Sequence, residues 1–185
     1  DGALLAFVGG KNGSSQIYIR RLGQLQAAPL AGTGGAQSPF FSPDGQWLAF
    51  YADSKLKKVS VTGGAAVTLG DAPGVLGGAW GDDGNIVFNT RAGLQRIASA
   101  GGQAEPLTKL GKGEVVQCFP QVLPGAKALL FTSHTSISRF DDANIVVQPL
   151  PADTPKVVVR GGYHGQYVAS GHIVYIHDGT LFAVP

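Results

Sequence analysis

The stretch that decides the fold is Ser42-Pro43-Asp44-Gly45-Gln46-Trp47-Leu48-Ala49-Phe50. The side chain of Asp44 can accept a hydrogen bond from the backbone two residues on, and Gly45 can adopt a positive φ at no steric cost. These properties predict a tight turn at Asp44-Gly45 that leads directly into a short apolar strand.

The same turn and strand recur along the chain. Asp1-Gly2 opens a copy that continues to Phe7, Asp83-Gly84 opens another that continues to Phe88, and two weaker copies follow. The turn glycines are 39 to 46 residues apart, and they are Gly2, Gly45, Gly84, Gly125 and Gly171. A period of this length is a signature of repeat architectures.

Each copy carries further short runs that are typical of strands. A second strand is expected at 16–19, 56–61, 94–98, 144–147 and 181–184, and a third at 28–30, 67–69, 105–107 and 157–159. A fourth strand, which leads into the next copy, is expected at 36–41, 74–80, 115–122 and 163–168. Four short strands in about 40 to 45 residues are typical of a propeller blade.

We therefore predict an all-β fold, a β-propeller of four-stranded antiparallel blades with about four to five blade registers. A single domain spans 1–185, with blade units at roughly 1–41, 42–80, 81–122, 123–168 and 169–185. The first unit lacks its leading strand and the last lacks its final one, so we expect three complete blades in an arc cut from a larger ring. An immunoglobulin-like sandwich ranks second, because it does not explain the near-constant spacing of the turns.

Composition excludes several other classes. The 28 glycines are about twice the usual share but show no three-residue period, which excludes collagen. The 14% charged residues argue against long charged helices, and the 44% hydrophobic residues argue against disorder. A net charge of +2 without a long basic cluster does not support nucleic-acid binding, and no run approaches the roughly 20 apolar residues of a membrane helix. Cys118 stands alone, so an intrachain disulfide is impossible.

The repeat predicts structural roles for two sets of residues, those that form the turns and those that pack between blades. The turn residues are Asp44, Gly45, Asp83, Gly84, Gly125 and Gly171. The aromatic residues that flank the turns are expected to pack between neighbouring blades, and they are Phe7, Phe41, Phe50, Trp80, Phe88, Phe131 and Tyr175.

The Ser-Pro-Asp-Gly turn followed by Leu-Ala-Phe resembles the WD-like β-propeller repeats of the TolB type. The stretches 16–30, 38–69 and 142–185 look most like the C-terminal propeller of bacterial receptor-type Ser/Thr protein kinases of the acidobacterial kind, for example in Lys57-Lys58-Val59-Ser60-Val61-Thr62-Gly63-Gly64. This resemblance implies a non-catalytic sensing or protein-binding module outside the cytoplasmic membrane, and it carries no catalytic residue onto this chain. The third copy departs from the pattern with Gly81-Asp82 in place of Ser-Pro, and the fourth lacks the Asp.

The sequence contains only weak matches to catalytic and metal-binding motifs. Ser54-Lys55-Leu56-Lys57 matches Ser-x-x-Lys, but it enters a strand, where the two side chains point to opposite faces. His164 and His177 could approach each other across an antiparallel pair, yet Asp178 is the only further ligand nearby, so we expect neither metal nor cofactor. His134 is expected in a loop.

The best candidates for partner contact lie in two places. The loop 132–143 is the longest within a blade, and it carries Arg139, Phe140 and Asp141. The strands expected to line the channel supply Gln117, Gln121 and His164. Because this lining is rich in amides and poor in acids, it favours binding over catalysis.

The sequence therefore predicts a non-catalytic interaction or sensor module, periplasmic or otherwise extracytoplasmic by resemblance. Its partner is a protein or a small polar ligand, and open blade edges offer a route to self-association. Two alternatives stay open: an accessory or catalytic propeller of a hydrolase, and a purely structural, self-associating spacer.

Overall fold

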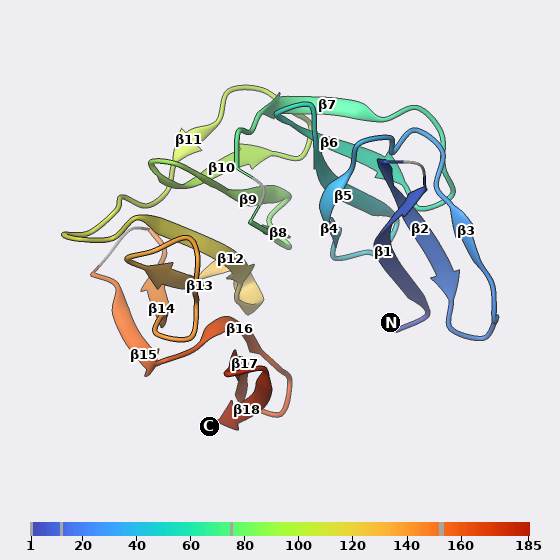
Figure 1. Ribbon diagram of the computed structural model, residues 1–185. Coiled ribbons are helices and arrows are strands. Elements are labelled where there is room, and N and C mark those ends of the chain that lie inside the picture. Colours follow the sequence, from blue (N-terminus) through green and yellow to red (C-terminus); the bar gives the residue numbers. More distant parts are fainter. Residues whose placement is uncertain (1, 12, 75, 152–153) are drawn as a thin grey trace.

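A computed structural model describes residues 2–11, 13–74, 76–151 and 154–185, and shows an all-β propeller arc (Figure 1). Five antiparallel sheets follow one another along the arc, with the first (blue) and the last (red) at its two ends. The predicted fold class is confirmed. Within the described ranges, the only helical segment is the three-residue 3-10 turn Pro124–Ala126, and no helix is long and apolar enough to cross a membrane.

The strands have the following bounds. The first sheet holds β1 (Leu4–Lys11), β2 (Ser14–Arg21) and β3 (Ala27–Pro29). The second holds β4 (Gln37–Phe41), β5 (Trp47–Ala52), β6 (Lys55–Ser60) and β7 (Val67–Asp71). The third holds β8 (Gly78–Trp80), β9 (Asn85–Thr90), β10 (Gly93–Ala98) and β11 (Glu105–Pro106). The fourth holds β12 (Val116–Val122), β13 (Ala128–His134), β14 (Asn144–Pro149) and β15 (Lys156–Arg160), and the fifth holds β16 (Tyr163–Tyr167), β17 (Ile173–His177) and β18 (Thr180–Val184).

The sheets are offset by one strand from the blade units read in the sequence. The tight turn at Asp44-Gly45 pairs β4 with β5, so the strand before each turn belongs to the same sheet as the strand after it. The unit 42–80 thus supplies three strands to the second sheet and the innermost strand to the third. The second, third and fourth sheets have four strands each, and we call them the middle sheets. The first and last sheets, at the two ends of the arc, have three strands each, and we call them the outer sheets.

Successive residues of each strand face opposite neighbours in the arc, because side chains alternate across a sheet. In β5, Leu48 and Phe50 pack with Ile17 of the first sheet, whereas Ala49 and Tyr51 pack towards the third sheet. The apolar core is therefore a series of layers between sheets. The strand after the turn contributes to two layers and carries an apolar run, as in Leu48-Ala49-Phe50 of β5 and Leu129-Leu130-Phe131 of β13.

The flanking aromatic residues are buried unequally. Phe50, Phe88 and Phe131 are 0%, 0% and 1% exposed, in the layers between sheets. The half-buried side chains that pack against these layers include Phe41, Trp80 and Tyr175.

Phe7 departs from the expectation that it packs between blades. It is 39% exposed and stacks on Tyr18 of its own sheet, with ring centroids 5.8 Å apart. The reason is the alternation of β1: Ala6 packs towards the second sheet, so Phe7 faces the other way.

The turns have the geometry that their residues favour. The Asp44 carboxylate accepts hydrogen bonds from Ser42 Oγ at 2.5 Å and from the Gln46 amide at 3.0 Å, and Gly45 has a φ of 68°. Asp83 likewise accepts from the Asn85 amide at 3.1 Å. Gly84, Gly125 and Gly171 all have positive φ, whereas Asp1 of the first copy lies outside the described residues.

Candidate binding cleft along the innermost strands

The four innermost strands share a positive φ at equivalent positions, and three of them have a bulge there. Ser38, Gly77, Phe119 and His164 have φ values of 45°, 80°, 49° and 53°. The strand register breaks at this point in the second, fourth and fifth sheets. The next residue is a Pro or a Gly in every case, and Pro cannot donate to a ladder, so these residues suit a bulge.

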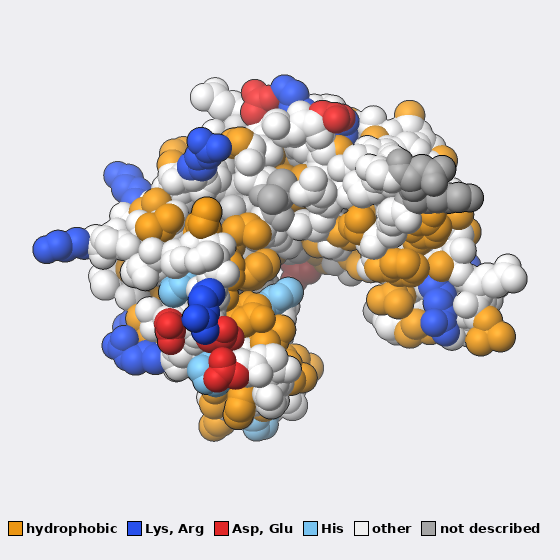
Figure 2. Space-filling view, in the orientation of Figure 1, with side chains coloured by type: hydrophobic (Ala, Val, Ile, Leu, Met, Phe, Trp, Pro, Cys, Tyr) orange, Lys and Arg blue, Asp and Glu red, His pale blue; other side chains and the backbone are white. Residues whose placement is uncertain are grey.

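The bulges border a cleft of about 390 Å³ that runs across the inner ends of four sheets. Its lining consists of Ser38, Pro39, Phe40, Phe41, Gly77, Gly78, Ala79, Trp80, Phe119, Pro120, Gln121, His164 and Gln166. Figure 2 shows hydrophobic side chains and a histidine along the hollow side of the arc. The volume lies within the range of ordinary ligand pockets.

Aromatic rings dominate one end of this cleft. The rings of Phe119 and His164 stack with centroids 4.7 Å apart and an interplanar angle of 9°. Phe140 lies edge-on to Phe119 at 5.8 Å and also contacts Tyr163 and His134, at centroid distances of 5.8 and 5.7 Å. We call Phe119, Phe140, Tyr163 and His164 the aromatic cluster.

The glycines of β8 make room for rings from the neighbouring sheets. A Cβ on Gly78 would lie 2.4 Å from Phe40 Cε1, and one on Gly77 would lie 3.2 Å from the Phe119 Cα. Both distances are shorter than ordinary van der Waals contact. The Gly77-Gly78 pair thus allows Phe40 and Phe119 to lie against the third sheet from either side.

Hydrogen bonds between adjacent sheets fix the bulges in place. The Tyr51 hydroxyl donates to the Gly77 carbonyl at 2.7 Å, the Phe119 amide to the Leu76 carbonyl at 2.9 Å, and the His164 amide to Thr132 Oγ1 at 2.9 Å. Burial raises the pKa of Tyr51, which keeps its hydroxyl a donor. The cleft is therefore held in shape by hydrogen bonds between the sheets.

His164 remains at the surface although one face of its ring lies on Phe119. Partial desolvation lowers the pKa of its imidazole. The neutral ring is thereby favoured near pH 7, so His164 adds a flat, weakly polar surface to the cleft.

Both glutamines that the sequence offers for partner contact form hydrogen bonds within the chain. Gln121 lines the cleft, but its amide donates to the Tyr167 carbonyl at 3.0 Å and accepts from the Tyr167 amide at 2.7 Å. Gln117 is buried, and it bonds Thr108 Oγ1, the Lys109 carbonyl and Glu114. Gln117 thus joins β12 to the segment that follows β11, and Gln121 joins the fourth sheet to the fifth.

Arg139 of the loop is exposed. Phe140 folds back into the aromatic cluster. Asp141 Oδ1 accepts a hydrogen bond from the Asp178 amide at 3.0 Å, which ties the loop to the fifth sheet. The loop is shorter than expected because β13 continues to His134, which is buried and pairs with Val116.

The histidines also pair differently from the expectation. His177 lies with Asp141 and Asp178, and one ligand atom from each lies within 4.8 Å of the others. These three residues are the group that could hold a cation in the described part of the chain. His164 is instead stacked on Phe119.

The Ser-x-x-Lys match at 54–57 shows an ordinary surface ion pair, in which Lys57 Nζ lies 2.7 Å from Asp53 Oδ2.

The sequence reasoning missed Phe40, Phe119 and Ser38. A signal was present: Pro39, Gly78, Pro120 and Gly165 each fall at the equivalent position of a predicted strand. A Pro or Gly inside such a strand indicates a bulge, and a bulge re-aims the side chain before it.

Comparisons with known proteins support the fold. No family model matches the sequence, and no curated protein matches it. TolB from Acinetobacter baumannii superposes with a TM-score of 0.71 at 16% identity, over 98% of this chain and 51% of that one. A chain of the nidogen/laminin complex superposes with a TM-score of 0.74 at 16% identity, over 98% and 73%.

An enzyme is among the similar structures as well. Oligogalacturonate lyase from Vibrio parahaemolyticus superposes with a TM-score of 0.69 at 14% identity, over 99% of this chain and 58% of the lyase. This chain thus spans about half the length of the TolB structure and under two thirds of the lyase. At these identities the likeness shows the fold alone, which is that of a β-propeller.

Proposed function

We propose that this propeller is an interaction module that binds a polypeptide in the cleft along its innermost strands. The observation that carries the proposal is the display of Phe40, Phe119 and His164 from rigid bulges into one cleft. Aromatic side chains contribute most of the binding energy in many interfaces, above all where they are held in place before binding.

The context of this module follows from the resemblance in its repeats. The stretches 38–69 and 142–185 support assignment to the extracytoplasmic part of a bacterial receptor-type Ser/Thr kinase or a related envelope protein. In that setting the cleft reports the presence of an extracellular or periplasmic polypeptide to the rest of the protein. The structure of a nidogen/laminin complex supports the idea that this fold suits protein partners.

The test is selection of peptides from a displayed random library on the immobilised chain, followed by affinity measurement on two variants. Phe119→Asn removes a ring and keeps a residue that tolerates positive φ. We expect it to weaken the selected peptides about tenfold or more, as truncation of a central aromatic residue does. The control is Phe7→Ala, which removes an exposed ring outside the cleft and should leave affinity unchanged.

Two results would overturn the proposal. One is a library that yields no binder. The other is a set of binders whose affinity is insensitive to Phe119→Asn. In either case the aromatic cluster would serve only to join the fourth and fifth sheets.

Two other functions have some support. The likeness to a lyase supports a propeller that carries or accompanies an enzyme activity. The apolar residues Leu5 and Leu181, 45% and 68% exposed on the outer sheets, support a self-associating spacer. Light scattering of the isolated chain over a range of concentrations distinguishes the spacer, because its mass would rise with concentration.

A further inference from the structure

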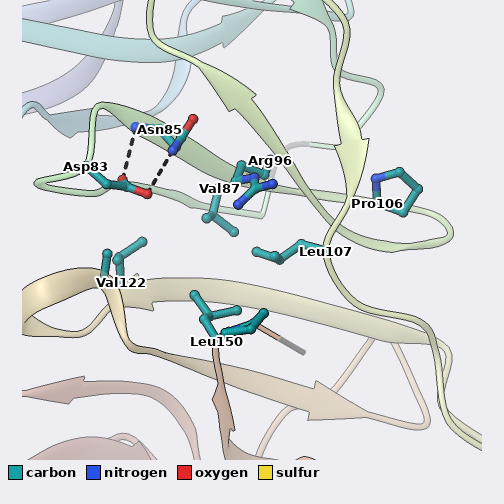
Figure 3. Close-up of a pocket in the computed structure, with 10 residues that line it drawn as sticks. Asp83, Asn85, Val87, Arg96, Pro106, Leu107, Val122 and Leu150 are labelled. Carbon is teal, nitrogen blue, oxygen red and sulfur yellow. Dashed lines mark hydrogen bonds between the residues drawn. The ribbon is translucent and has the colours of Figure 1, made fainter. Parts of the chain in front are cut away.

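A second pocket lies in the groove between the third and fourth sheets (Figure 3). The groove has a volume of about 420 Å³ and does not overlap the cleft described above. Val87 and Leu107 of the third sheet and its following segment face Val122 and Leu150 of the fourth. Asn85 and Arg96 lie at its edge.

Strand register identifies the equivalent groove between the second and third sheets. Trp47 and Lys58 occupy the positions of Asn85 and Arg96, because Ala49 pairs with Lys58 as Val87 pairs with Arg96. Trp80 pairs with Ile86 as Val122 pairs with Leu129, so Trp80 occupies the position of Val122.

In that equivalent groove the chain itself places two indole rings beside a cation. Lys58 Nζ lies 4.9 Å from the Trp47 ring centroid and 6.0 Å from that of Trp80. It also donates a hydrogen bond to the Ser99 carbonyl at 2.7 Å. A cation at these distances from an aromatic face is attracted to the negative charge of the ring face.

The groove between the third and fourth sheets keeps the cation and lacks the rings. Arg96 stands in the place of Lys58, about half exposed and paired with Glu105 at 3.0 Å. Asn85 and Val122 replace the two tryptophans, and Asn85 is turned to Asp83 by hydrogen bonds of 3.1 and 2.8 Å. The floor left behind is apolar, and the edge carries a guanidinium that stacks well on aromatic rings.

We propose that this groove binds an aromatic side chain, indole or phenol, from a partner polypeptide, with Arg96 over the ring face. Two properties select this occupant. The apolar floor matches the body of the ring, and the guanidinium is complementary to the negative face of the ring. The neighbouring groove shows the same arrangement satisfied from within the chain.

The experiment is an NMR titration of the whole chain with the capped peptide Ac-Gly-Trp-Gly-NH₂ and, as a matched probe, Ac-Gly-Leu-Gly-NH₂. We expect the tryptophan peptide to shift the amides of Asn85, Val87, Arg96 and Val122, and the leucine peptide to bind several-fold more weakly. Val122→Trp supplies the missing ring and should abolish these shifts. Arg96→Gln should weaken binding about two- to fivefold, whereas Arg160→Gln, an exposed arginine elsewhere, should have no effect.

Each other outcome would overturn the inference. Shifts that appear outside the groove, equal affinity for the two peptides, or no binding up to the solubility limit would each remove the site. So would binding to Val122→Trp that equals binding to the unaltered chain. Peptides selected for the cleft should still bind Val122→Trp, which separates this site from the proposed function and also shows that the variant is folded.

Discussion

The middle sheets and the outer sheets of the arc carry the same sequence pattern but bury it differently. Phe50, Phe88 and Phe131 are 0 to 1% exposed, whereas their equivalent Phe7 in the first sheet is 39% exposed. In the last sheet Phe182 is 42% exposed while it stacks on Tyr175. The difference shows that burial of an aromatic residue in this fold depends on the sheet that faces it.

The largest expected effect sharpens this contrast between equivalent aromatic residues. Phe88→Ala removes a ring from the layer between the second and third sheets, and we expect a loss of about 3–5 kcal/mol in the free energy of unfolding. Phe7→Ala removes a half-exposed ring, and we expect a loss of about 1 kcal/mol or less. Chemical denaturation of the two variants measures both values.

The control for these two variants is to repeat the denaturation at several protein concentrations. If the exposed faces of the outer sheets associate, the effect of Phe7→Ala will grow with protein concentration, because association stabilises the folded state. Equal losses for the two variants in dilute solution would contradict the contrast.

The second prediction compares the reactivity of thiols in a middle sheet and an outer sheet. Cys118 in β12 is fully buried, and burial raises the pKa of its thiol to about 12 from an ordinary value of 9.0. At pH 8 its thiolate share is therefore about a thousandfold below that of an ordinary thiol. We expect a thiol reagent to leave Cys118 unmodified in the folded chain and to modify it once denaturant is added.

A cysteine placed on the last sheet is the matched comparison. Ala183 is exposed on β18, so the thiol of Ala183→Cys should react at once in the folded chain. Rapid modification of Cys118 without denaturant would show that the fourth sheet opens readily, which its burial does not predict.

The smallest expected effect is on the pH dependence of stability. It compares the turn at Asp44 in a middle sheet with the corresponding turn at Gly171 in the last sheet. The hydrogen bond from Ser42 Oγ, followed by that from the Gln46 amide, lowers the pKa of Asp44. A carboxyl whose folded pKa is lowered stabilises the fold above its unfolded pKa, near 3.8, and that stabilisation is lost as the pH falls through the folded value. The turn at Gly171 has no carboxylate and therefore lacks this contribution to stability.

An NMR titration between neutral and acid pH checks this prediction through the Gln46 amide, which donates to Asp44. We expect its shift to report a low pKa, and Ser42→Ala to raise that pKa. A pKa that is unchanged in Ser42→Ala would show that the hydroxyl does not stabilise the carboxylate.

The sequence predicted much of the fold and little of the cleft. The recurrence of Asp-Gly turns before short apolar strands was enough to predict the arc, its strand order and the incomplete outer sheets. It did not predict the hydrogen bonds that Gln117 and Gln121 form within the chain, because an amide on a strand looks the same whether it bonds a ligand or a neighbouring sheet. It also missed Phe119, whose role depends on a bulge and on the ring of His164 from the next sheet.

The division has a physical reason. Turn geometry and side-chain alternation depend on residues adjacent in the chain, so the sequence alone determined the strands and the class of fold. Which rings are buried, which amides are bonded within the chain and which rings lie beside a cation depend on contacts between sheets, and only the tertiary structure decided these. The Trp47–Lys58–Trp80 arrangement and its ring-free counterpart at Arg96 are the clearest case, since their residues meet across two sheets.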